Sequence, residues 1–267
     1  TYPPSFNAQN MLIDDYGVTG LFSVRDFDLI KLANGNASGW NFSLDQFEID
    51  LMANTLVGAG FGGLITVPVG ENKEKNTLRY EGAFDGDGNY LMSVILTEDK
   101  KMTFDMLKAE ATIYKNSYVK IAVEDKQFRP EAMLHGKMSV KIDGSKEDKP
   151  KADMGGIKFQ SLHIMTKEPY LEAKYFGYQG KASISGVPIS LKELALVKGT
   201  KKGEVGLKIG VDMEFGETIS AGTDCTIFTQ VEKNSKGRMT LKYDRFFINS
   251  IDINADFAEV FAIKGHV

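Results

Sequence analysis

Residues 205–215 alternate strictly between apolar side chains and glycine or charged side chains. Alternation with a period of two over this length is typical of a long β-strand with one face on a core and the other in water. Such half-solvated strands belong to antiparallel sheets, because the strands of parallel sheets are covered on both faces. The sequence therefore predicts one continuous strand over 205–215 whose odd-numbered side chains are buried.

The same alternation recurs in shorter segments, at residues 90–96, 119–123, 138–142, 239–243 and 251–257. Polar, glycine-containing stretches such as 85–89 separate the segments and are typical of hairpin turns. The 27 glycines suit a fold with many turns. We therefore predict an all-β fold of long antiparallel meandering sheets with little helix. The sheets would form either a sandwich or an open, curved or solenoid-like sheet.

The alternation changes phase between residues 40 and 51. Apolar side chains occupy even positions up to Leu44 and odd positions from Phe47 onward. One extra residue near Asp45 and Gln46, as in a β-bulge, would produce this shift. A helix over 43–55 is the rival interpretation, because part of the segment has three-to-four spacing, but it lacks convincing caps at both ends.

Two segments bear on domain organisation. Residues 1–10 begin with a proline pair, which favours extended backbone, and are expected to form a linker. Residues 144–156 are charged, contain proline and lack apolar anchors, so we expect a mobile loop there. The rest, 11–267, is expected to be one β domain or two packed β halves, 11–143 and 157–267. Because the chain starts with Thr1, we expect it to be processed or cut from something longer.

Composition argues against several classes of protein. The formal net charge is −4, and lysine and arginine are dispersed along the chain, so we expect no nucleic-acid partner. No apolar run approaches the length of a membrane-spanning helix, so no transmembrane segment is expected. Cys225 is the only cysteine, which excludes an intrachain disulfide, and its alternating surroundings favour a buried strand position.

No pattern of catalytic residues stands out, so we expect no enzyme activity, no metal and no cofactor. The three histidines, His135, His163 and His266, lie at no metal-ligand spacing, and the chain has no Gly-x-Ser-x-Gly motif. The turn at 85–89 fails the EF-hand pattern at its sixth and twelfth positions. Carboxylate pairs remain an opening for glycoside chemistry; the candidates are Asp14 with Asp15, Asp26 with Asp28, and Glu48 with Asp50.

Aromatic side chains gather most densely at Tyr170, Tyr175, Phe176 and Tyr178, with Lys174 among them. Most other aromatic residues are phenylalanines on the apolar phase of a strand, where packing in a core explains them. We therefore expect these four side chains to form an exposed recognition surface.

Three phrases resemble segments of the very large, repetitive, β-rich exported proteins of gliding marine and soil bacteria. They are LIDDYGVTG (12–20), SGWNFS (38–43) and AGFGGLITVP (59–68). The resemblance implies a repeat module of an exported polypeptide, at an extracellular or cell-surface location, and it implies no chemistry. The phrase LHGKMSV (134–140) is also similar to the long curved sheets of bacterial lipid-bridging proteins.

Three functions are compatible with these patterns. The first is a non-catalytic structural or interaction module of a larger exported bacterial protein, whose partners are other segments of that polypeptide or other proteins. The second is an apolar-ligand or lipid-binding sheet, which needs an apolar strand face with no covering layer. The third is a carbohydrate-binding or carbohydrate-cleaving β-sandwich, which needs two carboxylates beside Tyr or Trp in a cleft.

Overall fold

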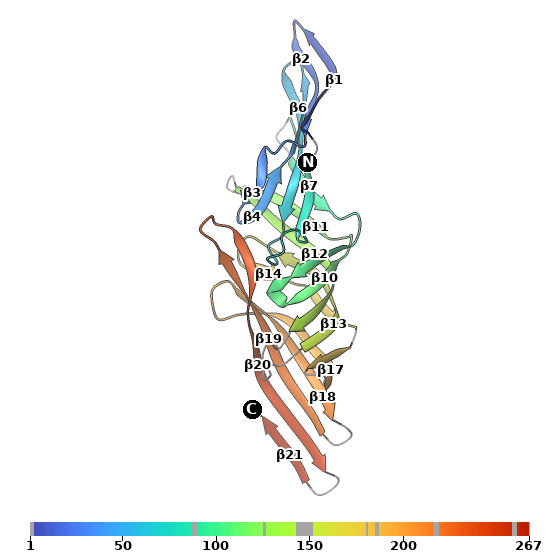
Figure 1. Ribbon diagram of the computed structural model, residues 1–267, viewed down its shortest axis with the longest axis vertical. Coiled ribbons are helices and arrows are strands. Elements are labelled where there is room, and N and C mark those ends of the chain that lie inside the picture. Colours follow the sequence, from blue (N-terminus) through green and yellow to red (C-terminus); the bar gives the residue numbers. More distant parts are fainter. Residues whose placement is uncertain are drawn as a thin grey trace.

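The computed structural model is an elongated all-β molecule (Figure 1). It describes residues 3–86, 90–124, 127–142, 152–179, 181–184, 187–215, 219–257 and 261–266. Strands account for 75% of the structure and helix for 1%, and the described strands form one large antiparallel sheet. The predicted all-β antiparallel fold with little helix is therefore confirmed, and its open form is the one observed.

Five strands form an extension at the N-terminal end, called the finger below (Figure 1). Their bounds are β1 (Ser5–Asp14), β2 (Gly17–Arg25), β5 (Gln46–Met52), β6 (Thr55–Thr66) and β7 (Thr77–Asp85). They pair antiparallel in the order β1–β2–β5–β6–β7. Two hairpin turns form the tip, where the Asn54 amide donates to the Val18 carbonyl at 3.0 Å and the Val18 amide donates to Asn54 Oδ1 at 2.9 Å.

The middle of the molecule holds eight strands and the only helical element of the described chain. The strands are β3 (Ile30–Ala37), β4 (Trp40–Leu44), β8 (Tyr90–Ile95), β9 (Lys100–Phe104), β10 (Ala109–Ile113), β11 (Tyr118–Glu124), β12 (Gln127–Ile142) and β13 (Ala152–Ile164). A single 3₁₀ turn, η1 (Asp105–Leu107), lies between β9 and β10. Strands β7 and β8 pair antiparallel from Phe84 and Tyr90, as the predicted hairpin requires, and residues 87–89 of its turn lie outside the described residues.

The C-terminal part begins with three short strands and continues with long ones (Figure 1). The bounds are β14 (Leu171–Glu172), β15 (Tyr175–Tyr178), β16 (Ala182–Ile184), β17 (Val187–Lys198), β18 (Glu204–Phe215), β19 (Ile219–Lys233), β20 (Met239–Phe257) and β21 (Phe261–His266). Strands β17 to β21 pair in chain order, each antiparallel to the next. This meander is the arrangement that the long alternating segments favour.

One hydrophobic core lies in the middle of the molecule and draws on both parts of the chain. Trp40, Phe104 and Phe159 are fully buried in the same cluster as Leu207 and Ile227. Full burial of each aliphatic side chain contributes about 1.5–3 kcal/mol, so this shared cluster is a main source of stability. The 3₁₀ turn η1 interrupts the strands here because it buries the side chains of Met106 and Leu107 in the core.

Backbone hydrogen bonds also join the N-terminal strands to the C-terminal ones. The Met239 amide donates to the Gly39 carbonyl at 2.8 Å, and the Leu241 amide donates to the Pro68 carbonyl at 2.9 Å. Thr229 Oγ1 donates to the Met106 carbonyl at 2.8 Å. The start of β20 is therefore held by residues about 200 positions earlier in the chain.

The strand predicted over 205–215 is confirmed as β18, and its alternation is largely as expected. Leu207, Ile209 and Val211 are buried as predicted, but Val205 and Met213 are only partly buried. On the other face, Lys208 and Asp212 stay partly exposed. The side chains of residues 214 and 215 lie outside the described part. The phase change near Asp45 corresponds to the break between β4 and β5, where the Asp45 amide donates to the Gly62 carbonyl at 3.0 Å. The rival helix over 43–55 is wrong, because these residues form strands.

Two expectations about non-strand segments need correction. Residues 5–10 of the expected linker belong to β1, because pairing with β2 satisfies one edge of their backbone. Residues 152–156 of the expected loop belong to β13, which pairs with β12 across the presumed boundary between the two halves. Residues 144–151 of that loop lie outside the described residues, so its mobility stays a prediction.

Candidate functional site

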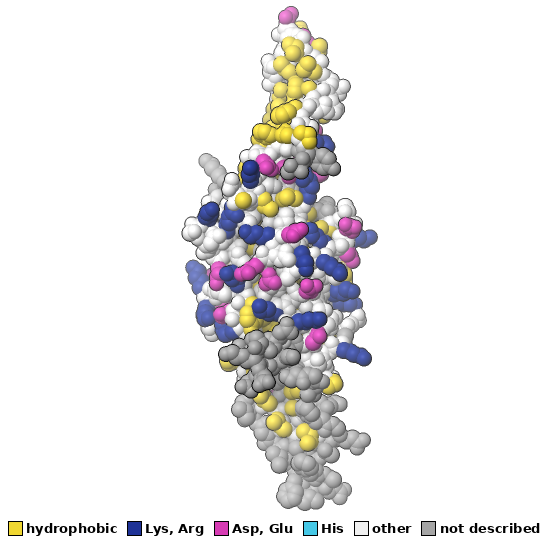
Figure 2. Space-filling model, in the orientation of Figure 1, with side chains coloured by type: hydrophobic (Ala, Val, Ile, Leu, Met, Phe, Trp, Pro, Cys, Tyr) yellow, Lys and Arg dark blue, Asp and Glu magenta, His cyan; other side chains and the backbone are white. Residues whose placement is uncertain are grey.

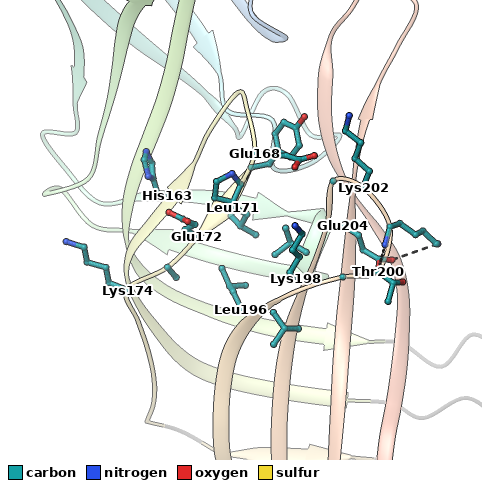
Figure 3. Close-up of a pocket in the computed structure, with 18 of the residues that line it drawn as sticks. His163, Glu168, Leu171, Glu172, Lys174, Leu196, Lys198, Thr200, Lys202 and Glu204 are labelled. Atoms are coloured by element: carbon teal, nitrogen blue, oxygen red, sulfur yellow. Dashed lines mark hydrogen bonds and ion pairs between the residues drawn. The ribbon is translucent and has the colours of Figure 1, made fainter.

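A cavity of about 820 Å³ opens between the segment around β14 and the hairpin that joins β17 to β18 (Figure 3). His163 and the segment from Glu168 to Lys174 line one side. Residues 196–205 line the other side and bring Lys198 and Lys202 to it. The pocket is therefore assembled from two loops about 30 residues apart, and both walls carry carboxylates as well as ammonium groups.

His163 is bound within the wall of the cavity. Its Nε2 lies 2.8 Å from Glu131 Oε2, and Glu131 Oε1 also pairs with Lys120 Nζ at 2.5 Å. Burial lowers the pKa of His163, and its Nε2–H donates to the Glu131 carboxylate. The neighbouring His135 accepts a hydrogen bond at Nδ1 from the Ser161 amide at 3.3 Å, where the β12–β13 pairing is irregular. Both histidines thus have structural partners.

Glu204 shapes the opposite wall. Its side chain is fully buried and pairs with Arg245, and its Oε2 accepts hydrogen bonds from the amides of Thr200 at 2.9 Å and Lys201 at 3.3 Å. The hydrogen bond from Arg245 is the main cause that lowers the pKa of Glu204. The ionised carboxylate closes the β17–β18 turn and so positions Lys198 and Lys202 at the cavity.

The chemistry of the cavity is that of a polar binding site. Glu168 and Glu172 flank Tyr170, a residue whose ring lies partly against the core. This places two carboxylates beside a tyrosine, but they are not the carboxylates that the sequence suggested. Within the described part of the chain, no group of three or more His, Cys, Asp or Glu side chains could hold a metal ion.

The predicted carboxylate pairs lie elsewhere. Asp14 and Asp15 are at the tip of the finger, where Asp14 Oδ1 accepts the Tyr16 amide at 2.9 Å. Glu48 and Asp50 lie on β5. Glu48 pairs with Ser23 and Gly60, and Asp50 pairs with Leu21 and Gly58. None of these residues lines the cavity. The side chain of His266 lies outside the described residues.

The four aromatic residues at 170–178 do not form one exposed surface, which corrects that expectation. Tyr170, Phe176 and Tyr178 are partly buried and pack against the core. Phe176 and Tyr178 lie on β15, which pairs with β13. Only Tyr175 among the four is exposed, at 52%.

A second candidate site is the apolar face of the finger, which the sequence alone did not show. The strand register aligns two rows of side chains on this face: Ala8, Phe22, Ile49, Ala59 and Phe84, then Phe6, Val24, Phe47, Phe61 and Gly82. The rows that alternate with them form the opposite, mostly polar face. They are Asn7, Ser23, Glu48, Gly60 and Ala83, then Gln9, Leu21, Asp50, Gly58 and Asp85.

No layer of the described residues covers the apolar face. Ala59 is its only buried member, Phe6 is 75% exposed, and the rings of Phe22 and Phe47 are reached by water. At the tip, Tyr16 is 83% exposed, next to exposed Ile13. Figure 2 shows hydrophobic side chains gathered along the finger, whereas charged side chains dominate the middle of the molecule. A face of this size that stays uncovered marks a binding surface more often than an ordinary exterior.

Comparison with protein-family models, with curated proteins and with solved structures finds no match. None of the helical structure in the described residues is long and apolar enough to cross a membrane.

Proposed function

We propose that this protein is a non-catalytic structural and interaction module of a larger exported bacterial polypeptide, and that it works at the cell surface or outside the cell. Its partner is a protein, either another segment of that polypeptide or a separate chain. The apolar face of the finger is the surface that binds this partner. The observation that carries the proposal is the pair of apolar rows that the register aligns and that none of the residues the structure describes covers with a second layer.

The physical argument starts from the amphipathic sheet. A half-apolar antiparallel sheet is normally covered on its apolar face by a second layer, as the middle of this molecule is. The strands of the finger alternate between apolar and polar side chains as the strands of a covered sheet do. None of the described residues forms a second layer over their apolar face. Burial of its aromatic rings against a partner would recover about 25 cal/mol for each Å² of apolar surface removed from water.

Site-specific photocrosslinking tests this proposal in the cell that makes the protein. A benzophenone amino acid replaces Ala8 on the apolar face, and the matched control carries it in place of the adjacent Asn7 on the polar face. Both side chains are exposed and lie on β1, so the two variants differ in face alone. We expect discrete protein adducts from position 8 and few from position 7.

Two outcomes would contradict the proposal. Equal crosslinking from both positions, or none, would show that the apolar face has no protein partner. Mass spectrometry of the natively purified protein discriminates the lipid alternative. A co-purifying lipid that Ala8→Lys removes, together with an absence of protein adducts, would assign the face to a lipid.

The cavity supports carbohydrate binding as a second candidate. Glu168, Tyr170 and Glu172 supply hydrogen-bonding groups and an aromatic ring on one wall. Calorimetric titration with neutral oligosaccharides tests it: Glu172→Gln should weaken binding, whereas Glu74→Gln, in an exposed loop away from the cavity, should not. Release of shorter sugars by the protein, lost in Glu168→Gln or Glu172→Gln, would replace the non-catalytic proposal by a glycosidase.

A further inference from the structure

The outer edge of β1 is open. Strand β1 pairs with β2 along one side, and no other described strand pairs with it. All ten of its residues are exposed. The backbone N–H and C=O groups along such an edge can accept a further strand, which is how many proteins bind extended peptides.

The edge also lacks most of the usual protection against strand addition. Natural edge strands are commonly blocked by lysine, proline or an inward-pointing charge. Strand β1 has the sequence SFNAQNMLID, which contains no proline and no basic residue, and its one charge, Asp14, is at the end. Its one irregularity is the register shift between Gln9 and Leu12, so the stretch from Ser5 to Gln9 is a regular edge.

The charges around the edge specify the chemistry of the added strand. Asp14 and Asp15 lie at the tip of the finger, and Asp26 and Asp28 lie at its base, on either side of Phe27. The Phe27 ring packs 6.1 Å from the ring of Phe6, which places this acidic pair beside the start of β1. Arg25 is the only basic residue in the β1–β2 hairpin and the three residues that follow it.

We infer that the open edge of β1 binds an extended protein segment that adds to the sheet as a further strand, with alternate apolar side chains continuing the apolar face and lysine or arginine at its ends. This inference rests on the proposed function and adds the identity of the partner. Pairing of β1 with β1 of a second copy is disfavoured, because the antiparallel arrangement brings Asp14 and Asp15 of one copy to the acidic base of the other.

Three synthetic peptides test the inference by fluorescence anisotropy. The first, KKTVTVTVTKK, has the inferred chemistry; the second, EETVTVTVTEE, reverses the terminal charges. The third is the first peptide N-methylated throughout its Val-Thr core, which removes the N–H donors and keeps the side chains. We expect the lysine peptide to bind about tenfold or more tightly than the glutamate peptide and to weaken as salt rises. The N-methylated peptide should not bind, because strand addition needs its N–H groups.

Variants locate the binding on the finger. Ala8→Lys should abolish binding of the lysine peptide. Asn7→Lys adds the same charge on the polar face, so it should weaken the affinity for this peptide only by the repulsion of one added positive charge. The double variant Asp14→Asn with Asp15→Asn should weaken the lysine peptide more than Glu48→Gln with Asp50→Asn. This second pair lies on the polar face of the same finger.

Each contrary result has a separate meaning. Crosslinks from position 8 without binding of the lysine peptide would overturn the inferred chemistry and leave the proposed function standing. Equal binding of the N-methylated peptide would overturn strand addition. Concentration-dependent dimers that Ala8→Lys dissolves would show that a second copy occupies the edge, and binding to phosphatidylcholine vesicles without peptide binding would show that a lipid surface does.

Discussion

The buried carboxylate of Glu204 organises the β17–β18 turn by holding Arg245 and two backbone amides. Glu204→Gln should lower the free energy of unfolding at pH 7 by about 1.5–3 kcal/mol, the usual loss for hydrogen bonds to a charged group. The loss should fall toward the lower end, because the Arg245 side chain is 35% exposed and water screens the pair. Urea unfolding at pH 7 measures it, with Glu74→Gln as an exposed control.

The pH dependence of the same variant has a definite sign. The folded-state pKa of Glu204 is lowered, chiefly by the hydrogen bond from Arg245, so the stabilisation is fully present above the unfolded pKa of about 4.3. It is lost as pH falls through the folded pKa. The difference in stability between Glu204→Gln and the native protein should therefore shrink below about pH 4. A constant difference down to pH 2 would contradict this role.

At the scale of elements, two of the four glycines in β6, Gly60 and Gly63, differ in the space that surrounds them. A Cβ at Gly63 would lie 2.1 Å from the Ser43 carbonyl oxygen, which also accepts a hydrogen bond from the Tyr80 hydroxyl at 2.7 Å. A Cβ at Gly60 would lie 3.7 Å from Glu48 Cβ, an ordinary contact. Gly63 is therefore required for the close approach of β4 and β6, whereas Gly60 is not.

Alanine substitutions test this difference. Gly63→Ala should destabilise the protein by about 1–3 kcal/mol, because two backbone segments must move apart. Gly60→Ala should be neutral or stabilise by about 0.4–1 kcal/mol, because alanine restricts the unfolded chain. Thermal or urea unfolding measures both, and a similar loss in the two variants would mean that strand pairing here does not depend on the close approach.

At the scale of the whole molecule, the single core predicts cooperative unfolding. Trp40 and Cys225 are the only residues of their types, and both are buried in that core, on strands β4 and β19. Burial, with a contribution from Asp224, raises the pKa of the Cys225 thiol to about 12, so the thiol is protonated and shielded in the folded protein. Tryptophan fluorescence and brief thiol labelling therefore report on the two halves separately.

We expect the two signals to give the same urea midpoint, because the halves share a core and the β12–β13 pairing. A Cys225→Ser variant serves as the unlabelled control. Two distinct midpoints would show that 11–143 and 157–267 unfold as separate domains.

Local sequence pattern determined the strands of this protein, and the tertiary structure decided what their faces do. Alternation over 205–215 specifies a strand because side-chain direction repeats every two residues, and β18 confirms it. Turn residues at 85–89 likewise specify a hairpin from local backbone preferences alone.

The alternation cannot tell whether an apolar face is covered. Phe22 and Leu207 have similar surroundings in sequence, yet only Leu207 is buried, because other strands pack over its face. The cavity depended in the same way on long-range pairing, which brings Glu172 opposite Lys198.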